Sequence, residues 1–358
     1  MNLDFFKPKA PPLFGLDISS SSVKMLEIVD AGRGAYRVER YVIEALPKDA
    51  VVDGNINILE AVADAVARGY KRLATRTKHV AMAVPTGAVI TKKIIVAAGL
   101  REEELETQVQ GEANQYIPFA LEEVNLDFQV VGPSPTNPEE QEVLIAATRK
   151  EKVSDRYAVA ENAGLKPLVM DVESFAQMSA LNLVVHALPG GGKDQNVAIV
   201  DVGANVMQVS VMRNYQSVYT REQAFGGNQL TNDIVSRYGM SPEEAENAKR
   251  SGGLPDDFEA EVLRPYMQNL SQEVQRALQF FFTSTSYNTV DHILLAGGSA
   301  VIPGLDEVVN TQTQVPTVVA NPFGAMQASP RIQLKKLMQD APSLIVACGL
   351  AMRRFDPV

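Results

Sequence analysis

Short apolar segments alternate with amphipathic ones along most of the chain. Two apolar stretches joined by a serine-rich turn, 13–17 and 23–29, predict a β-hairpin, and 36–45 predicts a third strand. At 59–73 apolar side chains recur at helical spacing, which predicts a helix, and a short apolar strand is predicted at 79–84. Strands that alternate with helices in this way are typical of the α/β class.

A separate unit is predicted at 85–164, inserted into this α/β pattern. One helix carries an apolar stripe from Leu105 to Ile117, and a second helix at 150–163 ends before Gly164. Because these elements can bury apolar side chains against one another, we expect a subdomain here. Its strands are expected at 89–97, 124–131 and 143–148.

The second half of the chain follows a glycine-rich segment, 189–193, that ends in a lysine. Ala187 stands where the first glycine of a phosphate loop belongs, and Asp194 follows the lysine, so we interpret the segment as a linker. The elements predicted around it are a buried helix from 174, a hairpin at 196–212, helices at 229–238, 242–250 and 270–282, a strand at 292–296 and an apolar helix at 341–355.

Two features of the first half recur in the second half, in the same order. An apolar strand ends at Asp17 and another at Asp201, and each is followed by a turn of small residues and a second apolar strand. Segments 78–85 and 291–297 are both short apolar strands that enter a small-residue turn. This repetition predicts a duplicated fold, with two related α/β halves and a cleft between them.

An aspartate at the end of a strand, followed by a tight turn, suits a nucleotide phosphate. Small residues let backbone N–H groups approach the anion, and the carboxylate can hold Mg²⁺ through its water ligands. Taken alone, each turn is equally a simple hairpin turn or a solvated serine loop. Their pairing favours a phosphate site made of Asp17, Ser19, Ser20, Ser21, Ser22 and Lys24 in the first half and Asp201, Gly203, Ala204 and Asn205 in the second.

The composition excludes several other classes of protein. The 358 residues carry 33 Lys and Arg against 43 Asp and Glu, and the resulting net charge of −10 argues against broad nucleic-acid binding. One cysteine, Cys348, excludes an internal disulfide, and three histidines argue against a His/Cys metal centre. No stretch matches the roughly 20 apolar residues of a bilayer span, and the N-terminus is unlike a signal peptide, so we expect a cytoplasmic protein.

The motifs, taken in order, resemble those of the actin-like ATPase superfamily. Segment 17–24 resembles its first phosphate motif, 168–176 its connecting segment and 201–203 its second phosphate motif. The resemblance implies a ribonuclease H-like fold, duplicated into two lobes with a central cleft for ATP and Mg²⁺, with Asp17 and Asp201 on the metal. Further implied nucleotide contacts are the double-glycine turn Gly226, Gly227 and Asn228, the ribose and base contacts Glu246 and Lys249, and the adenosine motif Gly297, Gly298 and Ser299.

The resemblance also places Glu173 where a Glu or Gln commonly orients the attacking water. Glu173 is equally suited to cap the helix that follows it, and Glu246 and Lys249 to an exposed helical face. Ser19 stands where the superfamily usually has glycine, and Met207 where it commonly has a hydroxyl residue. These departures put hydrolysis in question more than binding, so slow or no turnover is expected.

Within the superfamily, segments 14–27 and 110–119 resemble the PilM family of type IV pilus assembly, with the inserted unit where FtsA carries its extra subdomain. This implies a cytoplasmic scaffold that binds the N-terminal tail of the inner-membrane protein PilN, couples nucleotide state to that interaction, and is recruited to the membrane by its partner. Contact with pilus motor ATPases and weak self-association stay open. The rival hypotheses are an FtsA-like filament and a small-metabolite kinase, but the chain end lacks an amphipathic anchor and no sugar pocket is evident.

We therefore expect five parts. These are a tail at 1–12; a first-lobe core at 13–84 and 165–191, completed by the helix at 341–355; the inserted subdomain at 85–164; a second-lobe core at 192–224 and 291–340; and a smaller subdomain at 225–290.

Overall fold

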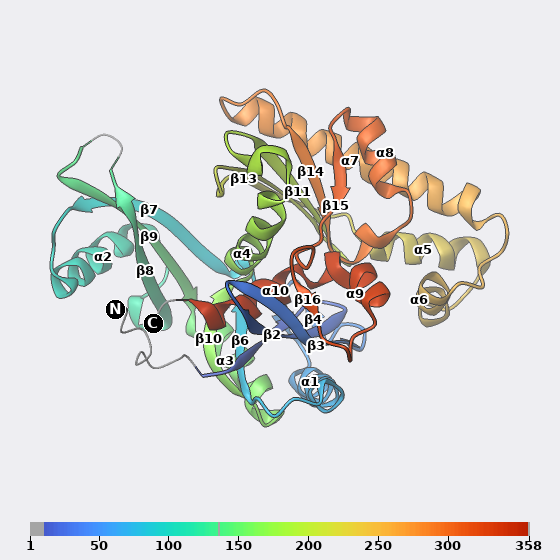
Figure 1. The fold of residues 1–358 in the computed structure, drawn as a ribbon, viewed down its shortest axis with the longest axis horizontal. Helices are drawn as coiled ribbons and strands as arrows, with labels where there is room; N and C mark the ends of the chain where they lie inside the picture. The colour runs from blue at the N-terminus through green and yellow to red at the C-terminus, as the bar shows by residue number, and fades with distance from the viewer. Residues whose placement is uncertain (1–10, 135–136, 357–358) are drawn as a thin grey trace. The chain divides into compact units, whose positions relative to one another are not determined.

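The computed structural model describes residues 11–134 and 137–356 of the chain, so residues 1–10 of the expected tail lie outside the described residues. The described chain forms two compact units (Figure 1). The first contains residues up to 25 and 42–175, and the second contains 26–41 and 176–356.

A mostly parallel sheet forms the centre of the first unit. Strands β1 (Leu13–Ile18), β6 (His79–Val84) and β10 (Lys166–Val172) run parallel in the order β10-β6-β1, with Leu13 and Lys166 both opposite His79. Strands β2 (Ser22–Gly32) and β3 (Ala35–Ala45) continue the sheet from β1. The strands predicted at its centre are therefore confirmed, and β6 begins and ends as expected.

Apolar faces of two helices cover this sheet. Helix α1 (Leu59–Leu73) buries Val62 and Val66, and α3 (Lys150–Asn162) buries Val159, in one core with Phe14 of β1. Burying such a side chain contributes about 1.5–3 kcal/mol, so the spacing seen in the sequence fixes which face of α1 is buried. A small hairpin, β4 (Val51–Val52) and β5 (Asn55–Ile56), joins β3 to α1.

The segment between β6 and β10 forms a second, smaller core in the same unit. Strands β7 (Val89–Ala97), β9 (Glu140–Arg149) and β8 (Val124–Pro133) pair antiparallel in the order β7-β9-β8. Helix α2 (Glu102–Tyr116) contributes Leu105, Val109 and Ala113 to this core, opposite strand residues such as Val143. Helix α3, which the prediction placed in this unit at 85–164, packs in the core of the parallel sheet instead. From here on the inserted subdomain means residues 86–149.

The sheet of the second unit repeats the first. Its strands are β11 (Asn196–Val202), β12 (Met207–Arg213), β13 (Gln216–Gln223), β14 (His292–Ala296) and β15 (Thr317–Val319). Their order is β13-β12-β11-β14-β15, with β11, β14 and β15 parallel and β12 and β13 antiparallel. The order β3-β2-β1-β6-β10 matches it strand for strand, which confirms the duplication predicted from the two aspartate turns.

Most of the remaining helices belong to the second unit. The long helix α7 (Arg264–Ser284) buries Leu270, Val274, Leu278 and Phe281, which recur at helical spacing, in a core with the β11–β12 hairpin. The other helices are α4 (Glu173–His186), α5 (Gly227–Tyr238), α6 (Pro242–Ser251), α8 (Leu305–Thr313), α9 (Leu334–Asp340) and α10 (Ile345–Met352). A short strand, β16 (Gln327–Ala328), pairs with β3.

The apolar C-terminal segment differs from the prediction of one helix at 341–355. A 3-10 turn, Ala341–Leu344, precedes α10, and a second one, Arg353–Phe355, follows it. Pro342 lies in the first turn, where proline is tolerated because its missing N–H has no helical partner there. Cys348 is fully buried, as expected of a small core residue. Among residues 11–134 and 137–356, no helix is long and apolar enough to cross a membrane.

Candidate functional site

The carboxyl ends of three parallel strands bring candidate residues of the first unit together. Asp17 lies near the end of β1, Thr86 follows β6, and Glu173 follows β10 directly. Since parallel strands end at the same edge of a sheet, this edge is where a ligand of an α/β fold is expected. We call Asp17, Lys24, Glu173 and the serine turn between the first two the first half-site.

Lys24 and the serine turn hold Asp17 in a defined arrangement. The Lys24 Nζ donates to Asp17 Oδ2 at 2.9 Å and to Ser19 Oγ at 3.3 Å, and Asp17 is 5% exposed. Ser19 closes the turn, because its N–H and its hydroxyl both donate to the Ser22 carbonyl, at 3.0 and 2.9 Å. The turn is therefore fixed by its own hydrogen bonds, and Lys24 is a partner of Asp17 and no isolated surface lysine.

Glu173 is the first residue of α4 and has a perturbed proton affinity. Burial and the neighbouring charge of Asp17 raise the pKa of Glu173 to about 7. The guanidinium of Arg156, a hydrogen bond from the Thr86 backbone N–H and the charge of Lys24 oppose that rise. A carboxyl group that titrates near neutral pH can accept or release a proton at physiological pH, which is what a general acid or base requires.

Arg156 lies beside this half-site, and no sequence motif marks it. It lies on α3 and is 1% exposed. Its Nε donates to the Ala83 carbonyl at 2.6 Å, and its Nη2 donates to the Gly54 carbonyl at 2.9 Å. Burial lowers the pKa of Arg156, while Glu173, Asp155 and Asp17 oppose that shift by their charges. A guanidinium stays protonated in proteins, so Arg156 places a fixed positive charge beside the half-site.

The second unit has a corresponding arrangement at the end of β11. Asp201 Oδ2 accepts a hydrogen bond from Nε2 of Gln177 on α4 at 2.5 Å. Gly297 follows β14 with φ +85, and a Cβ there would overlap both Asp201 Oδ1 and the Val202 carbonyl. Only glycine fits such a position without strain, so the carboxylate and the double-glycine turn are packed directly against each other. We call Asp201, its turn, Gln177 and the glycine turns around them the second half-site.

The glycine turn before α5 docks onto the turn after Asp201. The N–H of Gly227 donates to the Gly203 carbonyl at 3.0 Å, and the N–H of Asn228 donates to the Ala204 carbonyl at 2.8 Å. The side chains of Asn228 and Asn205 are also hydrogen-bonded, at 2.7 Å. The structure therefore brings these predicted residues together. The backbone N–H groups of Gly227 and Asn228 are hydrogen-bonded to protein carbonyls.

Glu246 and Lys249 of α6 lie against the start of α5. Lys249 Nζ donates to Thr231 Oγ1 at 2.8 Å and to the Gly227 carbonyl at 3.3 Å. Glu246 accepts from Thr231 at 2.8 Å and from Arg250 at 2.7 Å, and it pairs with Lys249. Burial raises the pKa of Glu246, but its bonds to these cations and to Thr231 outweigh that effect and lower it. The pair is thus partly buried and anchored, unlike a solvated helical face.

In the predicted adenosine motif, 297–299, Gly298 is open to its surroundings, whereas Ser299 is packed against the glycine turn before α5. Nothing lies within 4 Å of a Cβ built on Gly298, whereas a Cβ on Gly227 would lie 2.8 Å from Ser299 Oγ. Ser299 is 8% exposed, and it opposes the rise that burial causes in the pKa of Tyr266. Gly298 therefore presents an open backbone, while Ser299 is part of the packing below it.

The donor set suits Mg²⁺ held mainly by water and phosphate. Within the described ranges, no three His, Cys, Asp or Glu side chains gather into a metal cage. Mg²⁺ keeps several waters and is usually bound through one or two carboxylates together with substrate phosphates. One buried or half-buried aspartate beside each tight turn fits that requirement. The same residues do not provide the several protein ligands of a zinc or calcium site.

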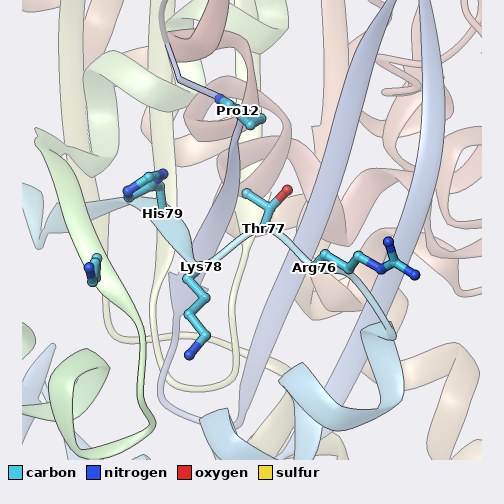
Figure 2. A pocket seen from close by; sticks show the side chains of 6 residues that line it. Pro12, Arg76, Thr77, Lys78 and His79 are labelled. Atoms are coloured by element: carbon cyan, nitrogen blue, oxygen red, sulfur yellow. The ribbon is translucent and has the colours of Figure 1, made fainter.

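A basic hollow lies at the opposite ends of the same parallel strands. Pro12, Arg76, Thr77, Lys78, His79 and Lys166 line it. Figure 2 shows the side chains of Arg76 and Lys78 pointing in different directions, so they do not converge on one point. The hollow therefore lacks hydrogen-bond donors that point at a common anion position, and it is separate from the half-site at Asp17.

Comparison with known proteins gives the family. A family model described as type IV pilus assembly protein PilM matches residues 15–355. The solved structure of a PilM-PilN type IV pilus biogenesis complex covers 98% of this chain and 100% of that chain, with a TM-score of 0.80 and 27% identity.

Two further matches are to ethanolamine utilization proteins. The structure of EutJ from Carboxydothermus hydrogenoformans has a TM-score of 0.58 at 15% identity, covers 97% of this chain and 90% of its own, and so shares the fold. EutJ from Escherichia coli (strain K12) is 24% identical over 117 residues, 33% of this chain, and the match spans 38% of that relative's length. The fold is the actin-like fold, and the chain belongs to the PilM family of type IV pilus assembly proteins.

Proposed function

We propose that this member of the PilM family binds ATP and the N-terminal tail of PilN, and that each ligand changes the affinity for the other. The observation that carries the proposal is the duplicated pair of half-sites, one aspartate turn in each unit. The similarity to a PilM-PilN complex at 27% identity supports PilN as the partner. The protein then works on the cytoplasmic side of the inner membrane, where the partner's tail recruits it.

The first half-site supplies charge for the phosphates. Lys24 and the turn at Ser19–Ser22 bind the β- and γ-phosphates, with Asp17 toward the metal. The second half-site supplies shape, because Gly298 offers an open backbone to the nucleotide, while Gly203 and Gly297 let the turns beneath it pack closely. Asp17 and Asp201 would hold Mg²⁺ through its water ligands, and the ion would supply positive charge against the phosphates.

Hydrolysis is proposed to be slow. Glu173 is the residue that positions water, but a carboxyl with a pKa of about 7 is protonated in a large fraction of molecules at neutral pH. Met207, at the position of a common hydroxyl residue, is fully buried and offers no hydrogen bond to a phosphate. Without such a clamp, phosphoryl transfer lacks much of its electrostatic stabilisation.

The tail is proposed to bind the first unit, beside the inserted subdomain. Calorimetric titration of a synthetic PilN tail peptide into the full chain, with and without ATP and Mg²⁺, tests both binding and coupling. We expect binding in both conditions, with affinities that differ about 5-fold or more. A peptide of the same composition in scrambled order is the control. Equal affinities with and without ATP would remove the coupling, and no saturable binding would remove PilN as the partner.

A further inference from the structure

The inserted subdomain is joined to the parallel sheet by two peptide connections, and both reach Glu173. The entry connection leaves β6 at Pro85, and its Thr86 backbone N–H opposes the rise in the pKa of the Glu173 carboxyl. The exit connection leaves β9 and becomes α3, which carries Arg156. Each connection thus contributes one positive or donor group to the surroundings of the same carboxylate.

Arg156 ties three segments at this junction. Its two hydrogen bonds reach the last residues of β6, at Ala83, and the β4–β5 turn, at Gly54. Gly54 has φ +73, and a Cβ there would lie 2.7 Å from Pro85 Cγ, so this turn is packed against the start of the entry connection. A buried guanidinium that bridges two carbonyls in this way has little freedom to move without breaking a bond.

The two connections are also tied to each other. Thr148, near the end of β9, donates its hydroxyl to the Ala88 carbonyl of the entry connection at 2.8 Å. A displacement of the inserted subdomain therefore moves the bases of both connections together. Since β9 continues directly into α3, that displacement reaches Arg156 through at most two turns of helix.

We propose that Arg156 is a positioning residue that transmits the state of the inserted subdomain to Asp17 and Glu173 in the first half-site. The inference rests on the proposed function, in which the partner tail binds beside that subdomain. Arg156 donates to the carbonyl of Ala83, which lies opposite Asp171, two positions before Glu173. Its charge acts on Glu173, Asp155 and Asp17, and Glu173 also feels the charges of Asp17 and Lys24 and the N–H of Thr86. A shift of α3 changes the distance from this fixed charge to both acidic side chains, which alters how the half-site holds phosphate.

The experiment measures the coupling between ATP–Mg²⁺ and the PilN tail peptide in the full chain. Tail affinity is titrated with and without nucleotide for wild type, Arg156→Lys and Thr86→Pro. The lysine keeps the charge but cannot bridge both carbonyls. The proline removes the N–H beside Glu173 and replaces the threonine side chain by its ring, at the first position of a 3-10 turn, where it is tolerated after the extended Pro85. Lys150→Met, an exposed change on the same helix, is the matched control.

We expect the affinity ratio of about 5-fold or more in wild type and Lys150→Met to fall below about 2-fold in both test variants. A purely structural Arg156 would lower thermal stability but leave this ratio unchanged, and that result overturns the inference. If Arg156→Lys does not fold, the affinity ratio of Thr86→Pro is the test, and an unchanged ratio overturns the inference. Absence of binding or coupling in wild type would instead refute the proposed function, so the two failures are distinguishable.

Discussion

The two half-sites derive from the same strand order but hold their aspartates differently. Asp17 is paired with a charged partner, Lys24, at 2.9 Å, within a cluster that includes Glu173 and Arg156. Asp201 accepts from a neutral amide, Gln177, and is packed against glycine backbone. Duplication therefore preserved the position of the carboxylate while its surroundings diverged. One half-site depends on charge and proton affinity, and the other depends on close backbone approach.

The largest effect is expected where the second half-site has no room. Gly297→Ala would place a Cβ into the Asp201 carboxylate and the Val202 carbonyl, in a conformation that side chains avoid. We expect the free energy of unfolding to fall by about 3–4 kcal/mol, from overlap and backbone strain together. Thermal and denaturant unfolding measure this loss.

Gly298→Ala is the control for that substitution, because the space around position 298 is open. It should change the free energy of unfolding by no more than about 0.5–1 kcal/mol. Equal losses for the two alanine variants would contradict close packing as the distinguishing property of the second half-site.

The first half-site is expected to respond most to loss of charge. Lys24→Met leaves the Asp17 carboxylate buried without its ion-pair partner, which should cost about 3 kcal/mol of stability. Gln177→Met, the corresponding change in the second half-site, removes a hydrogen bond from a neutral donor and should cost about 1–2 kcal/mol. Chemical denaturation at neutral pH gives both values. A larger loss for Gln177→Met than for Lys24→Met would contradict the view that the first half-site depends more on charge.

Glu173 makes the first half-site sensitive to pH. Its pKa is about 7 in the folded chain and near 4.5 when unfolded, so the folded state binds the proton more tightly. The resulting stability is fully present below about pH 4.5 and is lost as pH rises through about 7. Relative to Glu173→Gln, wild type should therefore lose up to about 3 kcal/mol between pH 5 and 8.

Glu246→Gln is the control for the pH series, because the pKa of Glu246 is shifted in the opposite direction. Its stability contribution is present above the unfolded pKa and is lost only as pH falls through the lower folded value, so its difference from wild type should stay constant from pH 6 to 8. A flat difference between wild type and Glu173→Gln over the same range would show that Glu173 is not shifted.

The smallest effect is expected at Glu246 and Lys249, the proposed ribose and base contacts. Glu246 and Lys249 are anchored to Thr231 and to each other, so a single change leaves part of the arrangement in place. Lys249→Met should weaken ATP binding by about 3–10-fold, which equilibrium titration can measure. An unchanged affinity would remove α6 from the nucleotide contacts.

The central strands could be predicted from the sequence because their apolar runs are short, buried and bounded by turns. Strands β6, β7 and β14 begin and end as predicted. Strands β10 and β15 were not predicted, since Pro167 and mixed exposure interrupt the first and the second has only three residues, Thr317–Val319. Edge strands carry little apolar pattern in their sequence, so they form only because they pair with a neighbouring strand in the folded sheet.

The site was predictable where motifs mark the chain and not where packing selects a residue. Asp17, Asp201 and the glycine turns stand out in sequence because few other residues fit such turns. Arg156 lies on a mostly polar helix in which no pattern distinguishes the one buried cation from its neighbours. Gln177 did carry a signal, because it follows Glu173 by four positions and so lies on the same face of α4.

Calorimetric titration of ATP–Mg²⁺ tests the central proposal, that the aspartate of each half-site contributes to ATP binding. The chains compared are wild type, Asp17→Asn, Asp201→Asn and, as a control at an exposed position, Asp256→Asn. Wild type and Asp256→Asn should bind equally, while each of the other two should lose at least about 30-fold in affinity, since each removes a carboxylate from the metal and phosphate contacts. Undiminished ATP binding by either Asp17→Asn or Asp201→Asn would contradict the account.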